Sequence, residues 1–205
     1  MMDISTLEKA DLAPENPLDI FGAWFETAKT TEPNDPDAMC LATVTKDGKP
    51  SARMVLLKDA SDKGFKFHTN SNSRKGHDLA ANSFAALCFH WKSIQKQVRV
   101  EGRVEIVDAA EADAYYATRP YGRQIGGWAS AQSEKMTTRS DLQASIQKVE
   151  DRFKDTVPVP RPPYWNGYRV IPERIEFWDN GEDRLHTRLL YEKDGENWVR
   201  SLLYP

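Results

Sequence analysis

One stretch of regular alternation, residues 95–107, limits the folds open to this chain more than any other feature. Apolar side chains recur there on every second position, as Val98, Val100, Val104 and Ile106. The polar positions between them are Gln97, Arg99, Glu101, Arg103 and Glu105. A period of two is typical of a β-strand, so we predict a long strand with one face in a core. Its other face is open to water or to a partner.

Other strand-like runs follow one another at hairpin spacing. They cover residues 39–44, 51–57, 65–69, 84–91, 168–171, 174–178, 185–191 and 198–203. Connections that contain Gly48, Gly181 or Gly195 separate neighbouring runs, as tight hairpins require. Gly102, inside the long strand, predicts a bulge or a close backbone approach. About eight strands with few long helices predict a mainly β fold with peripheral helices, built as an antiparallel barrel.

Four segments predict helices around this barrel. The first begins at Pro17 after the cap residue Asn16 and runs to about residue 28. The others cover residues 74–82, 108–118 and 140–153. Residues 121–133 are rich in glycine and amide side chains, so we predict a ligand-binding loop there. Its glycines lack the strand-then-helix context of a dinucleotide-binding motif.

Length and composition set the broad class. The 205 residues predict one domain at 16–205, preceded by a flexible segment at 1–15. The net charge of −3 excludes a generally basic nucleic-acid binder. No apolar run reaches membrane-spanning length and the N-terminus is polar, so we predict a cytoplasmic protein. Cys40 and Cys88 lie in apolar runs and are predicted as buried, reduced thiols.

A phosphate site is predicted between Arg53 and Lys75. Ser73 is a candidate helix cap, which places Arg74 and Lys75 in a first helical turn, where cations are unfavourable unless an anion binds. Arg53 and Lys58 bracket the apolar run 54–57, which we interpret as a buried strand. These cations favour a phosphorylated ligand, while a solvated basic turn is the alternative.

A second cluster is predicted near the C-terminus. Alternation along a strand would place Arg184, His186 and Arg188 on one face, where the charges repel unless an anion or polar ligand covers them. Ordinary surface charge is the alternative. Trp178 is a candidate aromatic wall of the same pocket, with core packing as its other interpretation. The four histidines show no metal-ligand spacing, and no nucleophile motif occurs, so no metal site is predicted.

An ordered set of motifs from the first helix to the end of the chain supports a resemblance. The set comprises residues 53–58, 73–76, 97–102, 119–120, 124–126, 132–133, 175–178 and 184–186. With these motifs the chain resembles the pyridoxamine 5'-phosphate oxidase family. The resemblance implies an FMN-binding split barrel and a homodimer with flavins between its subunits. It also implies oxidation of pyridoxamine or pyridoxine 5'-phosphate to pyridoxal 5'-phosphate, with O2 as electron acceptor and H2O2 as product.

The resemblance also assigns roles to residues. Those implied to hold FMN are Arg53, Met54, Val55, Leu56, Lys58, His68, Thr69, Arg74, Lys75, Gln97, Gln132, Ser133, Trp178 and Arg188. Those implied to hold the substrate are Lys58, Tyr115, Arg119, Arg123, Arg184 and His186. Arg184 and His186 are implied to lie over the substrate ring and are the catalytic candidates. Some of these residues would reach the flavin from the other subunit.

Several positions depart from the family pattern. Arg123 stands for a serine, Thr187 for an aspartate, His68 for a tyrosine and Asn166 for a glycine, and the chain end lacks the usual arginine before leucine. Because Arg123 and Thr187 lie near the implied substrate, substrate identity stays open. The alternatives are an FMN-dependent oxidoreductase of the same fold with another substrate, and a non-catalytic binder of FMN or pyridoxal phosphate.

Overall fold

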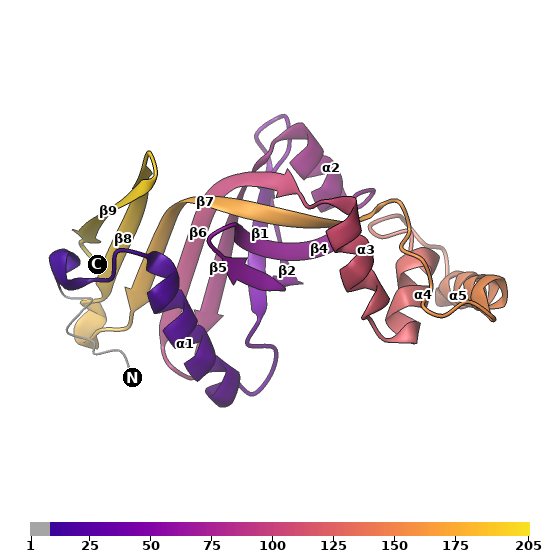
Figure 1. Cartoon of the computed structure of the whole chain (residues 1–205), viewed down its shortest axis with the longest axis horizontal. Helices are drawn as coiled ribbons and strands as arrows, with labels where there is room; N and C mark the ends of the chain where they lie inside the picture. The colour runs from indigo at the N-terminus through magenta and orange to yellow at the C-terminus, as the bar shows by residue number, and fades with distance from the viewer. Residues whose placement is uncertain (1–8) are drawn as a thin grey trace.

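The computed structural model describes residues 9–205 and centres on a nine-stranded antiparallel sheet (Figure 1). The strands are β1 Ala38–Val44, β2 Pro50–Leu56, β3 Asp59–Ser61, β4 Gly64–Asn70, β5 Phe84–Trp91, β6 Lys96–Ile106, β7 Trp165–Asp179, β8 Thr187–Asp194 and β9 Asn197–Leu203. The helices are α1 Pro17–Thr31, α2 Arg74–Ala81, α3 Ala109–Ala117, α4 Tyr121–Ala129 and α5 Arg139–Phe153. The sheet order is β2-β1-β5-β6-β7-β4-β3, and β8 pairs with β7 and β9.

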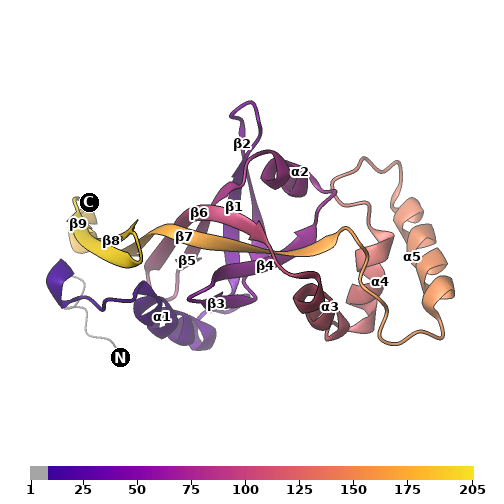
Figure 2. The same ribbon diagram turned by 45° about the horizontal axis from the view of Figure 1, so that its top comes forward.

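The strand β7 organises this sheet and crosses the molecule in both ribbon views (Figures 1 and 2). It pairs with β6 along its length, with β4 through its first half and with β8 through its second half. The two predicted strands 168–171 and 174–178 are therefore one strand. The bulge predicted at Gly102 is confirmed, because the β6–β7 register shifts there and a Cβ atom would lie 1.9 Å from the Ile171 carbonyl oxygen.

Helix α1 covers the core and the sheet curls toward closure. Phe21 is buried and meets Phe65 and Phe89 edge-on, with ring centroids 5.0 and 5.2 Å apart. Loss of one such side chain typically costs about 3–5 kcal/mol. The Lys58 N–H donates to the Lys66 carbonyl over 2.7 Å, which brings the end of β2 onto β4. The prediction of a mainly antiparallel β barrel with peripheral helices is thereby confirmed.

The predicted loop at residues 121–133 is wrong over most of its length, because residues 121–129 form α4. Each glycine costs a helix about 1 kcal/mol, but tertiary contacts outweigh that cost here. Gln124 is buried, its amide donates to the carbonyls of Tyr116 and Ala117, and its oxygen accepts from the Val159 N–H. Side-chain hydrogen bonds of this kind are invisible in local composition.

The apolar run 54–57 is not the buried strand that we predicted. β2 is the terminal strand on its side of the sheet and pairs with β1 alone among the described residues. Met54 is consequently 62% exposed, and only Leu57, just beyond the strand, is buried. An apolar run therefore indicated a strand correctly, but its burial depends on what covers that edge of the sheet.

The chain ends differ in how much the structure describes. Residues 1–8 of the predicted flexible segment lie outside the described residues. The remainder of that segment contacts the β8–β9 hairpin, since the Tyr191 hydroxyl donates to the Pro14 carbonyl and Arg200 to that of Ala13.

None of the helices in residues 9–205 is long and apolar enough to cross a membrane. Cys40 and Cys88 are free thiols, partly exposed rather than buried, and face each other across β1 and β5.

Candidate active site

The predicted cap and its two cations occur at the start of α2. The Ser73 hydroxyl oxygen accepts from the Gly76 N–H, and Arg74 and Lys75 form the first turn as expected. Lys75 is only 9% exposed. Its ammonium donates to the side-chain oxygens of Thr69, Ser73 and Gln132 at 3.1, 3.2 and 2.9 Å. All three partners are neutral, so within residues 9–205 the buried Lys75 ammonium has no counter-charge in hydrogen-bond reach.

Arg53 lies beside this turn. Its guanidinium donates to the hydroxyls of Thr43 and Ser51 at 2.6 and 2.7 Å and lies 3.7 Å from the Asp78 carboxylate. Burial lowers the pKa of Lys75, and the charge of Arg53 lowers it further. Among residues 9–205, Asp78 pairs with Arg53 and no carboxylate pairs with Arg74 or Lys75, which leaves this end of α2 positive.

A cavity of about 240 Å³ opens next to the α2 turn. It is lined by Met54, Val55, Leu56, Lys58, His68, Thr69, Lys75, Tyr115, Arg119, Arg123 and Gln132. Each of these residues was among the predicted site residues, and we call them the cavity cluster. They come from β2, β4, the helices α2 to α4 and the connections that contain Lys58, Arg119 and Gln132, so the fold brings together residues that are far apart in the sequence. Their roles toward a ligand stay predictions.

Three nearly parallel aromatic rings, those of Tyr115, His68 and Trp165, lie along one side of the cavity. The imidazole of His68 stacks on Tyr115 of α3 and on Trp165 of β7, with centroids 4.3 and 4.8 Å apart. The Arg119 guanidinium lies over the Trp165 ring at 4.8 Å. Burial lowers the pKa of His68 to about 4, and the nearby Lys66 and Arg119 charges act in the same direction. The ring is therefore neutral at neutral pH.

The remaining predicted residues lie elsewhere. Gln97, Trp178 and Arg188 are direct neighbours across β6, β7 and β8. The His186 ring contacts the Trp178 ring at a tilt of 44°, with centroids 4.5 Å apart, and its Nδ1 accepts from the Gly181 N–H. With the nearby Arg184, these residues form a second group that we call the strand cluster. Ser133, with a φ of +76°, belongs to neither group.

Two expectations about the strand cluster are wrong. Arg184 belongs to a 3-10 turn, residues 182–184, and β8 begins at Thr187, so strand alternation does not align Arg184 with Arg188. Nor does Arg188 lack a counter-charge. Its guanidinium donates to both oxygens of Glu176 at 2.9 and 3.0 Å, and this pairing raises its pKa. Glu176 is 4% exposed and also accepts from Arg99 at 3.3 Å.

The two clusters lie toward opposite ends of β7. The cavity cluster contacts Trp165 at the start of this strand, and the strand cluster includes Trp178 near its end. Thirteen residues of extended chain span roughly 40 Å. A single small ligand cannot reach from one ring stack to the other within one chain.

Sequence reasoning missed three residues that hold these clusters in place. Trp165 supports both His68 and Arg119, Asp78 accepts from Thr43 at 2.7 Å beside Arg53, and Glu176 fixes Arg188. For Glu176 a signal was present, because an acidic residue interrupts the apolar run around Phe177. The partners of Asp78 and Trp165 are not apparent from local sequence.

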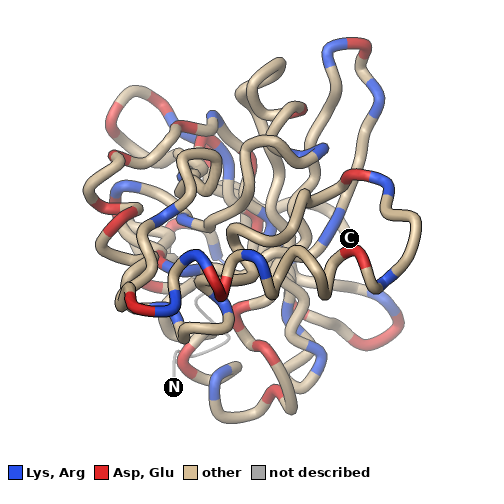
Figure 3. Tube along the Cα trace, turned by 90° about the vertical axis from the view of Figure 1, so that its right-hand side faces the viewer, with Lys and Arg blue, Asp and Glu red and all other residues tan. Residues whose placement is uncertain are grey.

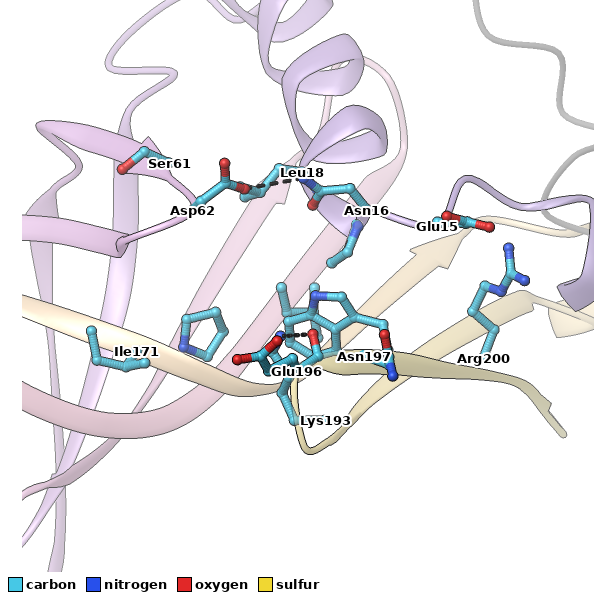
Figure 4. A pocket seen from close by; sticks show the side chains of 14 residues that line it. Glu15, Asn16, Leu18, Ser61, Asp62, Ile171, Lys193, Glu196, Asn197 and Arg200 are labelled. Atoms are coloured by element: carbon cyan, nitrogen blue, oxygen red, sulfur yellow. Dashed lines mark hydrogen bonds between the residues drawn. The ribbon is translucent and has the colours of Figure 1, made fainter.

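A larger cavity, of about 500 Å³, lies between the start of α1, the β3–β4 turn and the β8–β9 hairpin (Figure 4). It contains none of the predicted site residues. Polar groups that line this cavity hydrogen-bond to one another: the Asn16 amide donates to the Asp62 carboxylate, and the Lys193 ammonium donates to the Glu196 carbonyl. Seen from the end that carries α4 and α5, basic and acidic positions are interspersed along the chain (Figure 3). The cations of the cavity cluster are therefore a local concentration.

Family models match most of the chain. The model described as pyridoxamine 5'-phosphate oxidase matches residues 26–153. The model described as the pyridoxine 5'-phosphate oxidase C-terminal dimerisation region matches residues 165–205. The second match includes β7, β8 and β9, and with them most of the strand cluster.

Curated relatives agree with these matches. The chain is 50% identical over 194 residues to a pyridoxine/pyridoxamine 5'-phosphate oxidase of Myxococcus xanthus, covering 95% of this chain and 94% of the relative. It is 48% identical over 206 aligned positions to the protein of that name from Gluconobacter oxydans, covering 100% of both.

Solved structures share the fold. The crystal structure of PhzG from Burkholderia lata 383 in complex with tetrahydrophenazine-1-carboxylic acid has a TM-score of 0.90 and 31% identity, covering 100% of this chain and 98% of that one. An FMN binding protein from Nostoc punctiforme, related to pyridoxamine 5'-phosphate oxidase, has a TM-score of 0.73 and 15% identity, covering 93% and 98%. On this agreement of family models, relatives and fold, the chain belongs to the pyridoxamine 5'-phosphate oxidase family of enzymes.

Proposed function

We propose that the protein is an FMN-dependent oxidase that converts pyridoxamine or pyridoxine 5'-phosphate to pyridoxal 5'-phosphate, with O2 as electron acceptor and H2O2 as product. The family membership and the names of the 50% identical relatives support this proposal. The observation that carries it is the cavity cluster, because one cavity gathers residues that the resemblance assigns to flavin and to substrate.

The residues at the start of α2 suit the phosphate of FMN. Lys75 is buried and bonds to neutral oxygens only, so an anion would supply the missing counter-charge. Arg53, Arg74 and the free N–H groups of the first turn add to the attraction. Met54, Val55 and Leu56 provide an apolar edge for the flavin ring. We therefore assign FMN to this side of the cavity.

The substrate phosphate is assigned to the opposite side of the cavity. Lys58, Arg119 and Arg123 line it, and Lys58 alone of these has a carboxylate partner in residues 9–205, namely Asp37 at 2.9 Å. Tyr115 presents its ring there from α3. A phosphate monoester near neutral pH carries almost two negative charges, which would balance Arg119 and Arg123.

The strand cluster is proposed to act on the flavin of a second copy of the chain. Its residues lie too far along β7 to reach the cavity cluster of their own chain, and the dimerisation region includes most of them. The exposed Met54 edge of β2 is an apolar surface that such a partner would cover. In a two-fold symmetric dimer each cavity cluster would meet the partner's strand cluster, which completes two equal sites.

The chemistry divides between cofactor and protein. Bound FMN supplies a two-electron acceptor that O2 reoxidises. Arg184 and His186 are proposed to lie over the substrate ring and to hold its reacting carbon in line, while Trp178 excludes water. No strong base is required in this scheme, and because the His186 Nδ1 accepts from the Gly181 N–H, a neutral His186 ring carries its proton on Nε2.

One solved structure supports a second candidate function. PhzG, at 31% identity and a TM-score of 0.90, was crystallised with a tetrahydrophenazine carboxylic acid, which has no phosphate group. Arg123 could pair with a carboxylate as well as with a phosphate. The alternative is therefore an FMN-dependent oxidase of an aromatic carboxylic acid on the same scaffold.

The absorbance spectrum of the purified protein tests both functions. A yellow protein that bleaches on anaerobic addition of pyridoxamine 5'-phosphate, and forms pyridoxal 5'-phosphate, supports the first proposal. A yellow protein that bleaches only with an aromatic carboxylic acid supports the second. A protein that neither carries nor binds FMN contradicts both.

Lys75→Met supplies a variant for the cofactor assignment. A lost hydrogen bond to a charged group costs about 1.5–3 kcal/mol, so we expect FMN affinity to fall by about 10- to 150-fold. Lys148→Met is a matched control, because Lys148 is an exposed lysine of α5. Unchanged FMN affinity in the Lys75 variant would contradict this part of the assignment.

A further inference from the structure

His68 is a polar side chain whose hydrogen-bonding capacity is unused. Neither Nδ1 nor Nε2 is accessible to water or has a hydrogen-bond partner among residues 9–205. A neutral imidazole carries one donor and one acceptor, and leaving such groups buried and unpaired typically costs about 1–3 kcal/mol each. A ring held in this state by two aromatic neighbours calls for a functional explanation.

The Arg119 guanidinium, which lines the same cavity as His68, also has unused hydrogen-bonding capacity. Its Nη1 atom is likewise buried without a partner in the described chain. Arg123 makes no ion pair or side-chain hydrogen bond among the described residues. Burial lowers the pKa of Arg119, and the charge of Arg123 lowers it further. Arg119, Arg123 and His68 together line both the cavity of about 240 Å³ and an adjoining one of about 440 Å³. Two arginines without counter-charge therefore border the cavities in which His68 lies.

The charges around His68 are mostly positive. Lys66 lies on the same strand, Lys58 follows β2, and Arg119 and Arg123 come from the segment that joins α3 to α4 and from α4 itself. Among residues 9–205, Glu111 of α3 is the one carboxylate whose charge acts on the ring, and it already accepts from Lys66 and Arg169 at 2.6 and 3.1 Å. Tyr115 and Trp165 cover the ring faces without charge. A bound dianion would reverse the sign of this surrounding potential.

We infer that binding of the substrate phosphate beside Arg119 and Arg123 is coupled to proton uptake by His68. The anion balances both guanidinium groups and lowers the cost of a positive imidazolium in the same cavity. One proton passes from the solvent or buffer to a ring nitrogen of His68, where it forms an N–H bond, and no bond of the substrate changes. By thermodynamic reciprocity, a lower pH strengthens phosphate binding by the same factor that the phosphate raises the proton affinity of His68.

This inference rests on the proposed function, because it concerns the phosphate of that substrate. It adds a residue that selects for a dianionic group. A carboxylate ligand carries one charge and would balance only one of the two guanidinium groups. His68 would then stay neutral, so the coupling separates phosphorylated substrates from carboxylic acids.

Calorimetric titration of the FMN-loaded protein with sodium sulfate tests the coupling. Sulfate resembles a phosphate dianion but does not itself titrate near neutral pH, so any proton taken up must bind to the protein. Titrations at one acidic and one neutral pH, each in two buffers of different ionisation enthalpy, give affinity and proton uptake. We expect tighter binding at the acidic pH by about fivefold or more, with net uptake of protons.

His68→Phe is the informative variant, since it keeps an aromatic ring in the stack but cannot take up a proton. We expect its sulfate affinity to be independent of pH and its proton uptake to disappear. Equal proton uptake in this variant, no uptake in the original protein, or no sulfate binding at either pH would overturn the inference.

Histidine-selective NMR of the unmodified protein gives a second measurement should the variant not fold. The chain contains four histidines. We expect one of them to titrate near pH 4 without sulfate and at a higher pH with it. A set of histidine pKa values that sulfate leaves unchanged would contradict the inference. Neither experiment needs turnover, so loss of the coupling and failure of the flavin to bleach are separate results.

Discussion

The cavity cluster and the strand cluster are built in opposite ways. In the cavity cluster, Lys75 bonds only to neutral oxygens, and Arg119 Nη1 and both ring nitrogens of His68 have no hydrogen-bond partner among residues 9–205. In the strand cluster, the Arg188 guanidinium is paired within the chain, with both carboxylate oxygens of Glu176. Unpaired buried groups cost stability unless a ligand completes them, whereas paired ones hold a surface in shape. We therefore interpret the first cluster as a site that a ligand would complete and the second as a surface that is already formed within the chain.

The largest expected effect is a loss of turnover that leaves FMN binding nearly unchanged. In Arg184→Ala we expect kcat/KM to fall about 100-fold, or ~2.7 kcal/mol, with nearly unchanged FMN content, because Arg184 is exposed and proposed to cover the substrate ring. Steady-state kinetics and the flavin absorbance of the purified variant measure the two quantities. Arg139→Ala, at an exposed arginine that begins α5, is the control. Loss of FMN in the Arg184 variant would mean that this residue belongs with the cofactor.

Mixing two inactive variants tests whether the clusters meet across subunits. Arg119→Met disables the cavity cluster and Arg184→Ala the strand cluster. If each site uses one cluster from each chain, a mixed dimer keeps one intact site, and a statistical mixture regains about a quarter of the original activity. Co-expression with two affinity tags isolates the mixed dimer for assay. Activity no higher than the sum of the two separate variants would show that both clusters serve the same chain's site.

Glu176→Gln tests whether pairing holds the strand cluster in shape. Removing the charge leaves Arg188 and Arg99 without their shared partner, and we expect a loss of about 2–3 kcal/mol in the free energy of unfolding. For a chain of this size the midpoint of thermal unfolding then falls by about 4–10 °C. Glu105→Gln, at an exposed position of β6, is the matched control. An unchanged midpoint in the Glu176 variant would show that its ion pairs do not stabilise the strand cluster, which contradicts the difference drawn between the two clusters.

The smallest expected effect concerns stability against pH in the cavity cluster. His68 has a pKa of 6.5 in the unfolded chain and about 4 in the folded one, so the unfolded chain binds the proton first as pH falls. The resulting loss of stability develops below pH 6.5 and levels off below about 4. Allowing for partial solvent exposure, we expect it to reach about 1–2 kcal/mol.

Chemical denaturation across this pH range, compared between the original protein and His68→Phe, measures the difference. The variant lacks the titrating group, so the gap between the two stabilities should change below pH 6.5 and stay constant above it. Parallel curves over the whole range would show that the folded protein binds the His68 proton as readily as the unfolded chain.

Local chemistry made much of this protein predictable. Alternation at residues 95–107, the turns at Gly48 and Gly195 and the caps Asn16 and Ser73 specify short-range geometry, and the structure confirms them. Two details of these predictions are wrong: Ile106 is 67% exposed at the end of β6, and the connection that contains Gly181 is a longer loop with a 3-10 turn. The cluster at the start of α2 followed from the same reasoning, since a cap hydroxyl and first-turn cations are neighbours in sequence. Family motifs then extended the prediction to most residues of the cavity cluster.

What failed depended on partners that are distant in sequence. The glycines of α4 suggested a loop, yet the buried Gln124 ties that segment to α3 and to Val159. Arg184 and Arg188 looked like one charged face, but a turn displaces the first and Glu176 neutralises the second. Period and composition report what a residue prefers locally. Which edge is exposed, which cation stays unpaired and which end of β7 a side chain joins are decided by tertiary packing, because burial and charge pairing depend on atoms brought together only by the fold.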